Sequence, residues 1–185
     1  MPEIDVLESV LGKTGDLIAN VDTAQLTDPT PCPAYDVAGL RDHIVGWSRS
    51  FAAGSAERPP DGDPAAYECG ADPAAEFSAA AADIVAGWRD HGFDRDVAMS
   101  SGSSPGEMVF NMTLMEYLTH GWDLATATSQ PVPYSEAEAT EALARAEATL
   151  LDEYRGEAFG PRVSVADDAP AVDRFVAFMG RDPQA

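Results

Sequence analysis

The chain has 185 residues and a formal net charge of −21, with 32 acidic and 11 basic residues. Such a charge repels nucleic acids and anionic lipid surfaces, so we expect neither as a partner. Hydrophobic residues make up 45% of the chain, but no apolar run approaches the length of a membrane span. We therefore expect one domain over residues 1–185, with a core of its own and no membrane segment.

The amino-terminal half predicts three helices. Apolar residues with 3.6-residue spacing over 6–21 predict the first. Asp36 is a favourable N-cap for a second helix, which carries His43 on its apolar side. Residues 53–74, rich in Ala, Gly, Pro and Asp, are expected to form a connecting loop. Apolar spacing over 77–88 predicts the third helix.

The second half predicts three more helices. Residues 91–107 contain glycines and a serine-rich run, which indicate a loop or a short extended connection before a fourth helix over 107–128. Ser135 followed by Glu138 is a capping box that opens a fifth helix, expected to reach Arg155. Proline in the first turn favours a short final helix over 170–179.

No strong strand alternation and no heptad run are visible in the sequence. The predicted fold class is therefore all-α, a four-helix bundle with additional short C-terminal helices.

One helix pair carries the strongest chemical signal. Glu116 and His120 are four residues apart on the predicted fourth helix, so both project from one face. His43 on the second helix offers a third ligand. Two imidazoles and one carboxylate suit zinc or a similar divalent ion, and three protein ligands leave one coordination position open. A Glu–His hydrogen bond without a metal is the structural alternative, and the pattern alone leaves both open.

Asp123 lies one turn beyond His120, and helical side chains lean toward the N-terminus. It is therefore a candidate for orienting the His120 imidazole, with a solvated carboxylate as the alternative. Trp47, Tyr117 and Trp122 are aromatic residues that either wall a substrate pocket or belong to the ordinary core.

The remaining histidine and the two cysteines give weaker signals. His91 precedes a loop without a paired ligand nearby and is expected at the surface. Cys32 and Cys69 form neither a disulfide framework nor a C-x-x-C site, so we expect reduced thiols in a cytoplasmic protein. Cys32 is expected to be a small buried hydrophobe, with a reactive thiol as the alternative.

Four segments carry a family resemblance: Thr-Pro-Cys-Pro-Ala-Tyr-Asp-Val (30–37), Asp-His-Ile-Val-Gly (42–46), Met-Glu-Tyr-Leu-Thr-His-Gly-Trp-Asp-Leu-Ala-Thr-Ala-Thr (115–128) and the tail 168–183. Together they resemble the DinB/YfiT-like metalloprotein superfamily, and within it proteins similar to the N-terminal domain of mycothiol-dependent maleylpyruvate isomerase.

The resemblance implies a four-helix bundle that binds a divalent metal. Carried over residue by residue, the ligands are His43, Glu116 and His120. Zinc is the expected metal, with nickel and iron as alternatives. The resemblance also implies a low-molecular-weight thiol, such as mycothiol or bacillithiol, as cofactor or co-substrate.

The leading hypothesis is a thiol-dependent metalloenzyme that catalyses transfer or isomerisation of an electrophilic substrate, with Asp123 orienting His120. One alternative is a metal-dependent hydrolase, for which Asp123 is the only acidic general base that the motif offers. Another is a non-catalytic metal-binding or ligand-sensing bundle. The sequence leaves a homodimer open.

Overall fold

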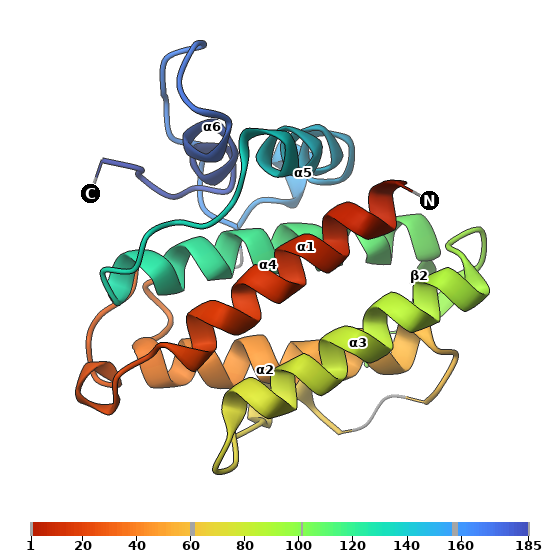
Figure 1. Cartoon of the computed structure of the whole chain (residues 1–185). Coiled ribbons are helices and arrows are strands. Elements are labelled where there is room, and N and C mark those ends of the chain that lie inside the picture. Colours follow the sequence, from red (N-terminus) through yellow and green to blue (C-terminus); the bar gives the residue numbers. More distant parts are fainter. Residues whose placement is uncertain (1, 60–61, 101, 157–158, 185) are drawn as a thin grey trace.

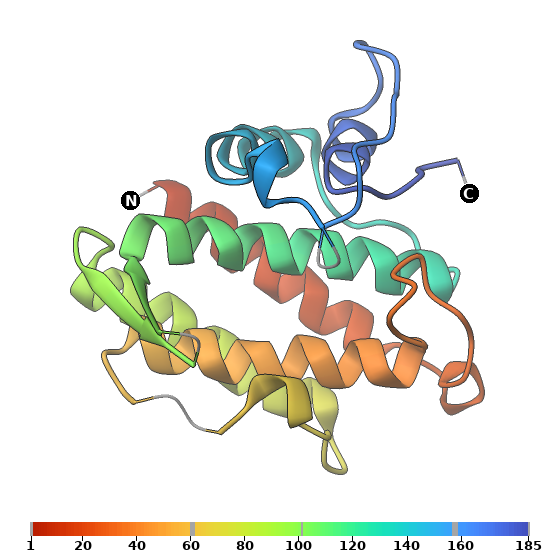
Figure 2. The ribbon, with the colours of Figure 1, turned by 180° about the vertical axis from the view of Figure 1, so that it is seen from behind.

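The computed structural model describes residues 2–59, 62–100, 102–156 and 159–184, and it is mostly helical (Figures 1 and 2). Its α-helices in these residues are α1 (Pro2–Ala19), α2 (Val37–Ser55), α3 (Pro73–His91), α4 (Gly106–Ala127), α5 (Glu136–Thr149) and α6 (Ala171–Phe178). Short 3-10 turns are η1 (Thr23–Gln25), η2 (Pro64–Ala66) and η3 (Asp152–Tyr154). The predicted helical character is confirmed.

Side chains that cap the first turns explain where several helices begin. The Asp36 carboxylate accepts a backbone N–H of the first turn of α2, and Ser135 and Glu138 form a reciprocal capping box at the start of α5. Both predicted caps are confirmed. Helix α3 starts at Pro73, inside the stretch predicted as a loop, because Asp72 caps it and proline suits the first helical position.

Helix α4 is the central helix of the molecule. Helices α1 and α2 each pack against both α3 and α4, while α5 packs on α4 and α6 packs on α5. Figure 1 shows α5 and α6 on one side of α4, with α2 and α3 on the other. Sixteen of the 22 residues of α4 are buried, so this helix is covered on several sides. Polar side chains on α4 are therefore placed in the interior.

The prediction of an all-α fold is confirmed only in part, because the connection between α3 and α4, expected as a loop or a short extended segment, forms a small sheet. Strands β1 (Asp96–Met99) and β2 (Gly102–Pro105) pair antiparallel there. Val97 and Met99 are buried and their neighbours in β1 are exposed, so this strand does alternate. Four residues are too few for such an alternation to stand out in the sequence. The hairpin packs against α2 and α4.

Helix α5 is shorter than predicted. It ends at Thr149, and Leu150 leaves the helical conformation with φ −97° and ψ 90°. The Thr149 hydroxyl accepts a hydrogen bond from the Asn111 side chain of α4, and Leu150 is buried. The end of α5 is thus held by tertiary contacts, and the helix stops before the predicted end at Arg155.

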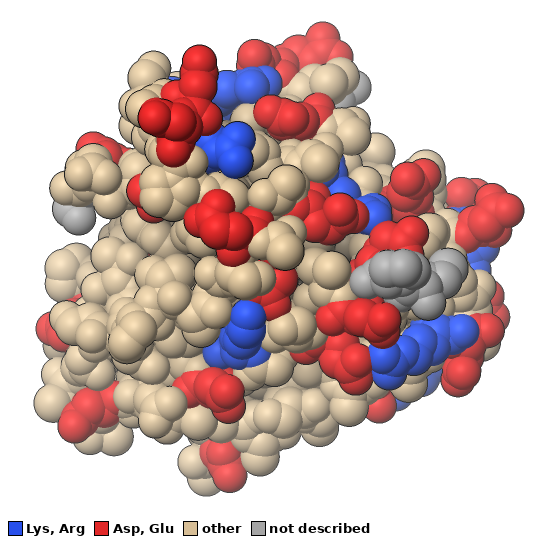
Figure 3. Space-filling view, turned by 45° about the horizontal axis from the view of Figure 1, so that its top comes forward, with Lys and Arg blue, Asp and Glu red and all other residues tan. Residues whose placement is uncertain are grey.

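The surface reflects the composition. On the face shown in Figure 3, acidic side chains are scattered and the basic side chains lie among them. None of the described helices combines the length and the hydropathy that a membrane span requires.

Candidate metal centre

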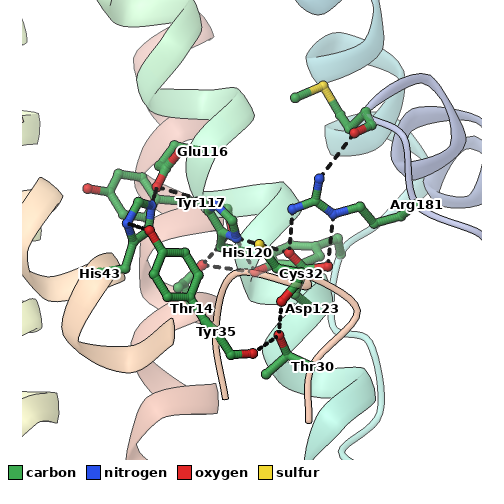
Figure 4. Close-up of polar contacts among 12 residues, drawn as sticks. Thr14, Thr30, Cys32, Tyr35, His43, Glu116, Tyr117, His120, Asp123 and Arg181 are labelled. Carbon is green, nitrogen blue, oxygen red and sulfur yellow. Dashed lines mark hydrogen bonds and ion pairs between the residues drawn. The ribbon is translucent and has the colours of Figure 1, made fainter. Parts of the chain in front are cut away.

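Helices α2 and α4 bring together the His43, Glu116 and His120 side chains, although 73 residues separate the first two (Figure 4). His43 Nε2 lies 2.8 Å from Glu116 Oε1, and His120 Nε2 lies 3.6 Å from the same oxygen. Ligand atoms of the three residues all lie within 4.8 Å of one another. We call this group the His–Glu–His cluster.

His43 is held from behind by Tyr35. The Tyr35 hydroxyl lies 2.9 Å from His43 Nδ1, and the two ring centroids are 4.8 Å apart. Tyr35 belongs to the segment before α2, where the Thr30 hydroxyl donates to the backbone carbonyls of Cys32 and Tyr35. The Tyr35–His43 contact fixes the His43 imidazole so that its Nε2 faces Glu116. Sequence reasoning missed Tyr35, since its side chain reaches the site only through the path of an irregular segment.

His120 is held in the same manner by Asp123. Its Nδ1 lies 2.9 Å from Asp123 Oδ2, as the N-terminal lean of helical side chains predicts. Asp123 is fully buried, so the predicted alternative of a solvated carboxylate is wrong. Its second partner is Arg181, whose Nη2 donates to Oδ2 at 2.9 Å and whose Nε donates to Oδ1 at 3.2 Å. Arg181 was also missed, because no sequence pattern indicates that the segment following α6 lies beside α4.

Charge and burial have opposite effects on the pKa values of Glu116 and His120. Burial alone would raise the pKa of Glu116, but the charge of His120 and the hydrogen bond from His43 outweigh it and the pKa is lowered. Burial would lower the pKa of His120, but Glu116 and then Asp123 outweigh it and the pKa is raised. The cluster therefore favours a carboxylate beside a protonated imidazole, and a metal ion would compete with that proton.

The donor set fits a divalent cation. Each histidine uses Nδ1 for its own partner, Tyr35 or Asp123, and turns Nε2 toward Glu116. Metal-ligating histidines have this arrangement, in which the other ring nitrogen is hydrogen-bonded. The exposed fractions of the side chains are 15% for His43, 22% for Glu116 and 11% for His120, so the cluster is shielded but still reaches solvent.

Cys32 lies on the other side of His120. Its sulfur, a ligand atom of His120 and one of Asp123 also lie within 4.8 Å of one another. This second group suits a metal less well, because Asp123 is already bonded to Arg181 and His120. Burial raises the pKa of the Cys32 thiol, which favours the protonated form. Cys32 is 8% exposed, in agreement with the predicted buried residue.

The three aromatic candidates separate into core and site. Tyr117 is fully buried and packs edge-on against Phe51 and Phe77, and Trp122 is buried as well. Both belong to the core. Trp47 is half-buried and its ring centroid lies 6.2 Å from that of His43, so it borders the cluster. His91 is exposed, as predicted.

Two hollows lie away from the cluster. One, of about 660 Å³, lies between α2 and α3, and the other, of about 640 Å³, between α1 and α3. Neither is lined by a residue of the His–Glu–His cluster. Chemistry at the cluster would use its own opening to solvent.

Fold and site together define a mostly helical protein with a carboxylate and two imidazoles between two helices. The family described as "Mycothiol maleylpyruvate isomerase N-terminal domain" matches residues 7–125, and the chain belongs to this DinB-like family. The matched region contains His43, Glu116, His120 and Asp123 but ends before Arg181.

Two relatives from Mycobacterium tuberculosis cover most of the chain. They are the uncharacterised proteins MT0763 of strain CDC 1551 / Oshkosh and Rv0738 of strain ATCC 25618 / H37Rv. Each is 33% identical over 172 residues, which is 89% of this chain and 90% of the relative. No solved structure was found to match the chain.

Proposed function

We propose that the chain binds a divalent metal, zinc in the first place, through His43, Glu116 and His120, and uses a low-molecular-weight thiol of the mycothiol type. The observation that carries this proposal is the convergence of the three ligand atoms within 4.8 Å. Membership of a mycothiol-related family supports the thiol. The substrate class would be an electrophile that undergoes transfer or isomerisation.

The residues in and around the cluster would have different roles in binding the metal. The two Nε2 atoms and the Glu116 carboxylate would hold the cation, and Tyr35 and Asp123 would keep the imidazoles in place. A divalent cation at this position supplies a positive centre that stabilises the deprotonated form of a thiol at neutral pH. Trp47 would shield one side of the cluster from water.

The hydrolase alternative loses its general base. Asp123 is fully buried and both of its carboxylate oxygens are bonded to Arg181. It has no free face for a water molecule. A non-catalytic metal-binding or ligand-sensing protein remains the second candidate, since the same cluster would serve it equally.

Metal analysis of the purified protein and zinc titration of four variants test the metal site. We expect His43→Gln, Glu116→Gln and His120→Gln each to lower zinc affinity by at least about tenfold, the loss that even an outer partner of a ligand produces. His91→Gln is the matched control, because His91 is exposed and lies outside the cluster. Equal affinity of all four variants and the wild type would overturn the proposal.

Binding of mycothiol tests the second part of the proposal, the use of a low-molecular-weight thiol. We expect mycothiol, but not its S-methyl derivative, to raise the melting temperature of the zinc-loaded protein. Turnover of an electrophile with mycothiol would then identify an enzyme, whereas stabilisation without turnover in a screen of electrophiles would favour the sensing protein. Equal effects of both compounds would exclude the thiol role.

We further propose a single domain over residues 1–185, in which α1, α2, α3 and α4 form the four-helix bundle of the family. Its support is the mutual packing of these helices. The free thiols of Cys32 and Cys69 support a reducing compartment such as the cytoplasm.

A further inference from the structure

Arg181 connects the end of the chain to the candidate metal centre. Its guanidinium is 8% exposed and pairs with the fully buried Asp123 through two nitrogens. The third nitrogen, Nη1, donates to the backbone carbonyl of Met179 at 3.2 Å. All three nitrogens are therefore occupied, and the planar group has a fixed orientation.

The backbone after α6 directs Arg181 toward the site. Gly180 has φ +84°, a conformation that favours glycine. The Gly180 N–H donates to the Ala177 carbonyl and the Arg181 N–H to the Val176 carbonyl, which is the pattern of a Schellman motif. This motif ends α6, reverses the chain and delivers the Arg181 side chain to α4 (Figure 4).

Asp123 links Arg181 to His120, one of the three proposed metal ligands. Asp123 Oδ2 is shared between Arg181 Nη2 and His120 Nδ1, at 2.9 Å from each. An ionised carboxylate only accepts hydrogen bonds, so His120 must donate from Nδ1, and in the neutral imidazole Nε2 is then the unprotonated nitrogen that faces Glu116. A two-point contact with a guanidinium also fixes the plane of the carboxylate, which a single contact would not.

We propose that Arg181 is a positioning residue of the metal centre, which acts through Asp123 to fix the ring orientation and tautomer of His120. The inference rests on the proposed metal function. It extends the site beyond residues 7–125, the part that the family comparison matches, to the segment after α6.

Zinc affinity, measured by competition with a chromogenic chelator at one pH, is the first test. Arg181→Met removes the two-point contact, and we expect about tenfold weaker binding, as for other partners of metal ligands. Arg181→Lys keeps the charge without the planar fork and should fall between wild type and Arg181→Met. The control is Arg162→Met, because Arg162 stacks on Phe178 in the same part of the chain without touching Asp123. It should leave affinity within about twofold.

A double variant separates positioning from general loosening. If Arg181 acts through Asp123, Asp123→Asn with Arg181→Met should bind zinc no more weakly than Asp123→Asn alone. This double variant also removes both buried charges together, so it remains informative if Arg181→Met alone does not fold. Additive losses, or an equal loss in Arg162→Met, would overturn the inference.

The ¹⁵N shifts of the His120 ring in metal-free protein at alkaline pH give a readout that does not depend on the metal. We expect the proton on Nδ1 in the wild type and a mixture of tautomers in Arg181→Met. Unchanged shifts would refute the positioning role. If the wild type bound no metal, the proposed function would fail, while these shifts would still decide whether Arg181 sets the His120 tautomer.

Discussion

The Lys13 ammonium of α1 donates to both carboxylate oxygens of Glu138 in α5, at 2.8 and 2.6 Å. Lys13 is the only lysine of the chain. Glu138 also accepts from the Ser9 hydroxyl and from the Ser135 backbone N–H. This buried carboxylate thus joins α1 to the beginning of α5.

Acid should weaken this junction. Burial would raise the pKa of Glu138, but the bonds from Lys13, Ser9 and Ser135 outweigh it and lower the pKa to about 2. Because the folded pKa lies below the unfolded value of about 4.3, the stabilisation is present above the unfolded pKa and is lost as the pH falls toward 2. We expect Glu138→Gln to cost about 2 kcal/mol in urea unfolding at pH 7 and roughly half of that at pH 3, where the folded carboxyl is still mostly ionised. The exposed Glu147 of the same helix is the control, and Glu147→Gln should change stability little at either pH. An equal cost of Glu138→Gln at both pH values would contradict the assignment.

Gly121 is required where α4 meets Tyr134. A Cβ on Gly121 would lie 2.8 Å from Tyr134 Cζ and still closer to its hydroxyl. That hydroxyl is bonded to Thr14 and to the Tyr117 carbonyl, so it has little freedom to move. We expect Gly121→Ala to lower the free energy of unfolding by about 2 kcal/mol or more, measured by urea denaturation. Gly12→Ala is the control: a Cβ there meets nothing within 4 Å, and alanine should stabilise α1 by roughly 0.5–1 kcal/mol.

Tyr35→Phe tests the support of His43. The substitution keeps the ring but removes the hydroxyl that lies 2.9 Å from His43 Nδ1. We expect about tenfold weaker zinc binding, with little change in melting temperature, because the loss affects ligand orientation more than packing. Tyr67→Phe removes a hydroxyl bonded to Glu76, away from the cluster, and should leave zinc affinity unchanged. A similar loss in both variants would mean that the Tyr35 contact is not specific to the metal.

Chelation should lower the melting temperature and leave the helices intact. The described core is extensive and joins residues of all the longer helices, so folding does not depend on the metal as it does in a zinc finger. A bound metal adds stability by mass action, about 2.7 kcal/mol at a free concentration of 100 times Kd. Circular dichroism before and after chelation measures both effects, and a random-coil spectrum without metal would contradict the expectation.

The features predicted well from the sequence are local ones. The cap at Asp36, the capping box at Ser135 and the shared face of Glu116 and His120 each depend on a few residues in one turn of helix. The reach of Asp123 to His120 is likewise a property of one turn. Such features follow from helix geometry alone, so a few neighbouring residues in the sequence are enough to predict them.

The features that were missed depend on contacts between distant segments. Arg181 meets Asp123 across 58 residues, and the pattern of neither segment contains that pairing. Thr149 at the end of α5 bonds to Asn111 of α4, and Val97 of the hairpin is buried in the core, and neither contact can be read from the local sequence. The proximity of His43, Glu116 and His120 was therefore predictable from the sequence, while their role as metal ligands stays a prediction and two of the residues that support them were missed.

The central position of α4 also determines which fragments of the chain can be produced. A fragment that stops at the end of α4 would keep all three proposed ligands, yet it would lose the cover that α5 provides. The side of α4 that carries Phe110 and Asn111, now against Arg145 of α5, would be open to water. Exposed apolar surface of this kind promotes aggregation. Recombinant work on the candidate metal centre should therefore retain the chain through Arg181, and insolubility of shorter fragments would say nothing about metal binding.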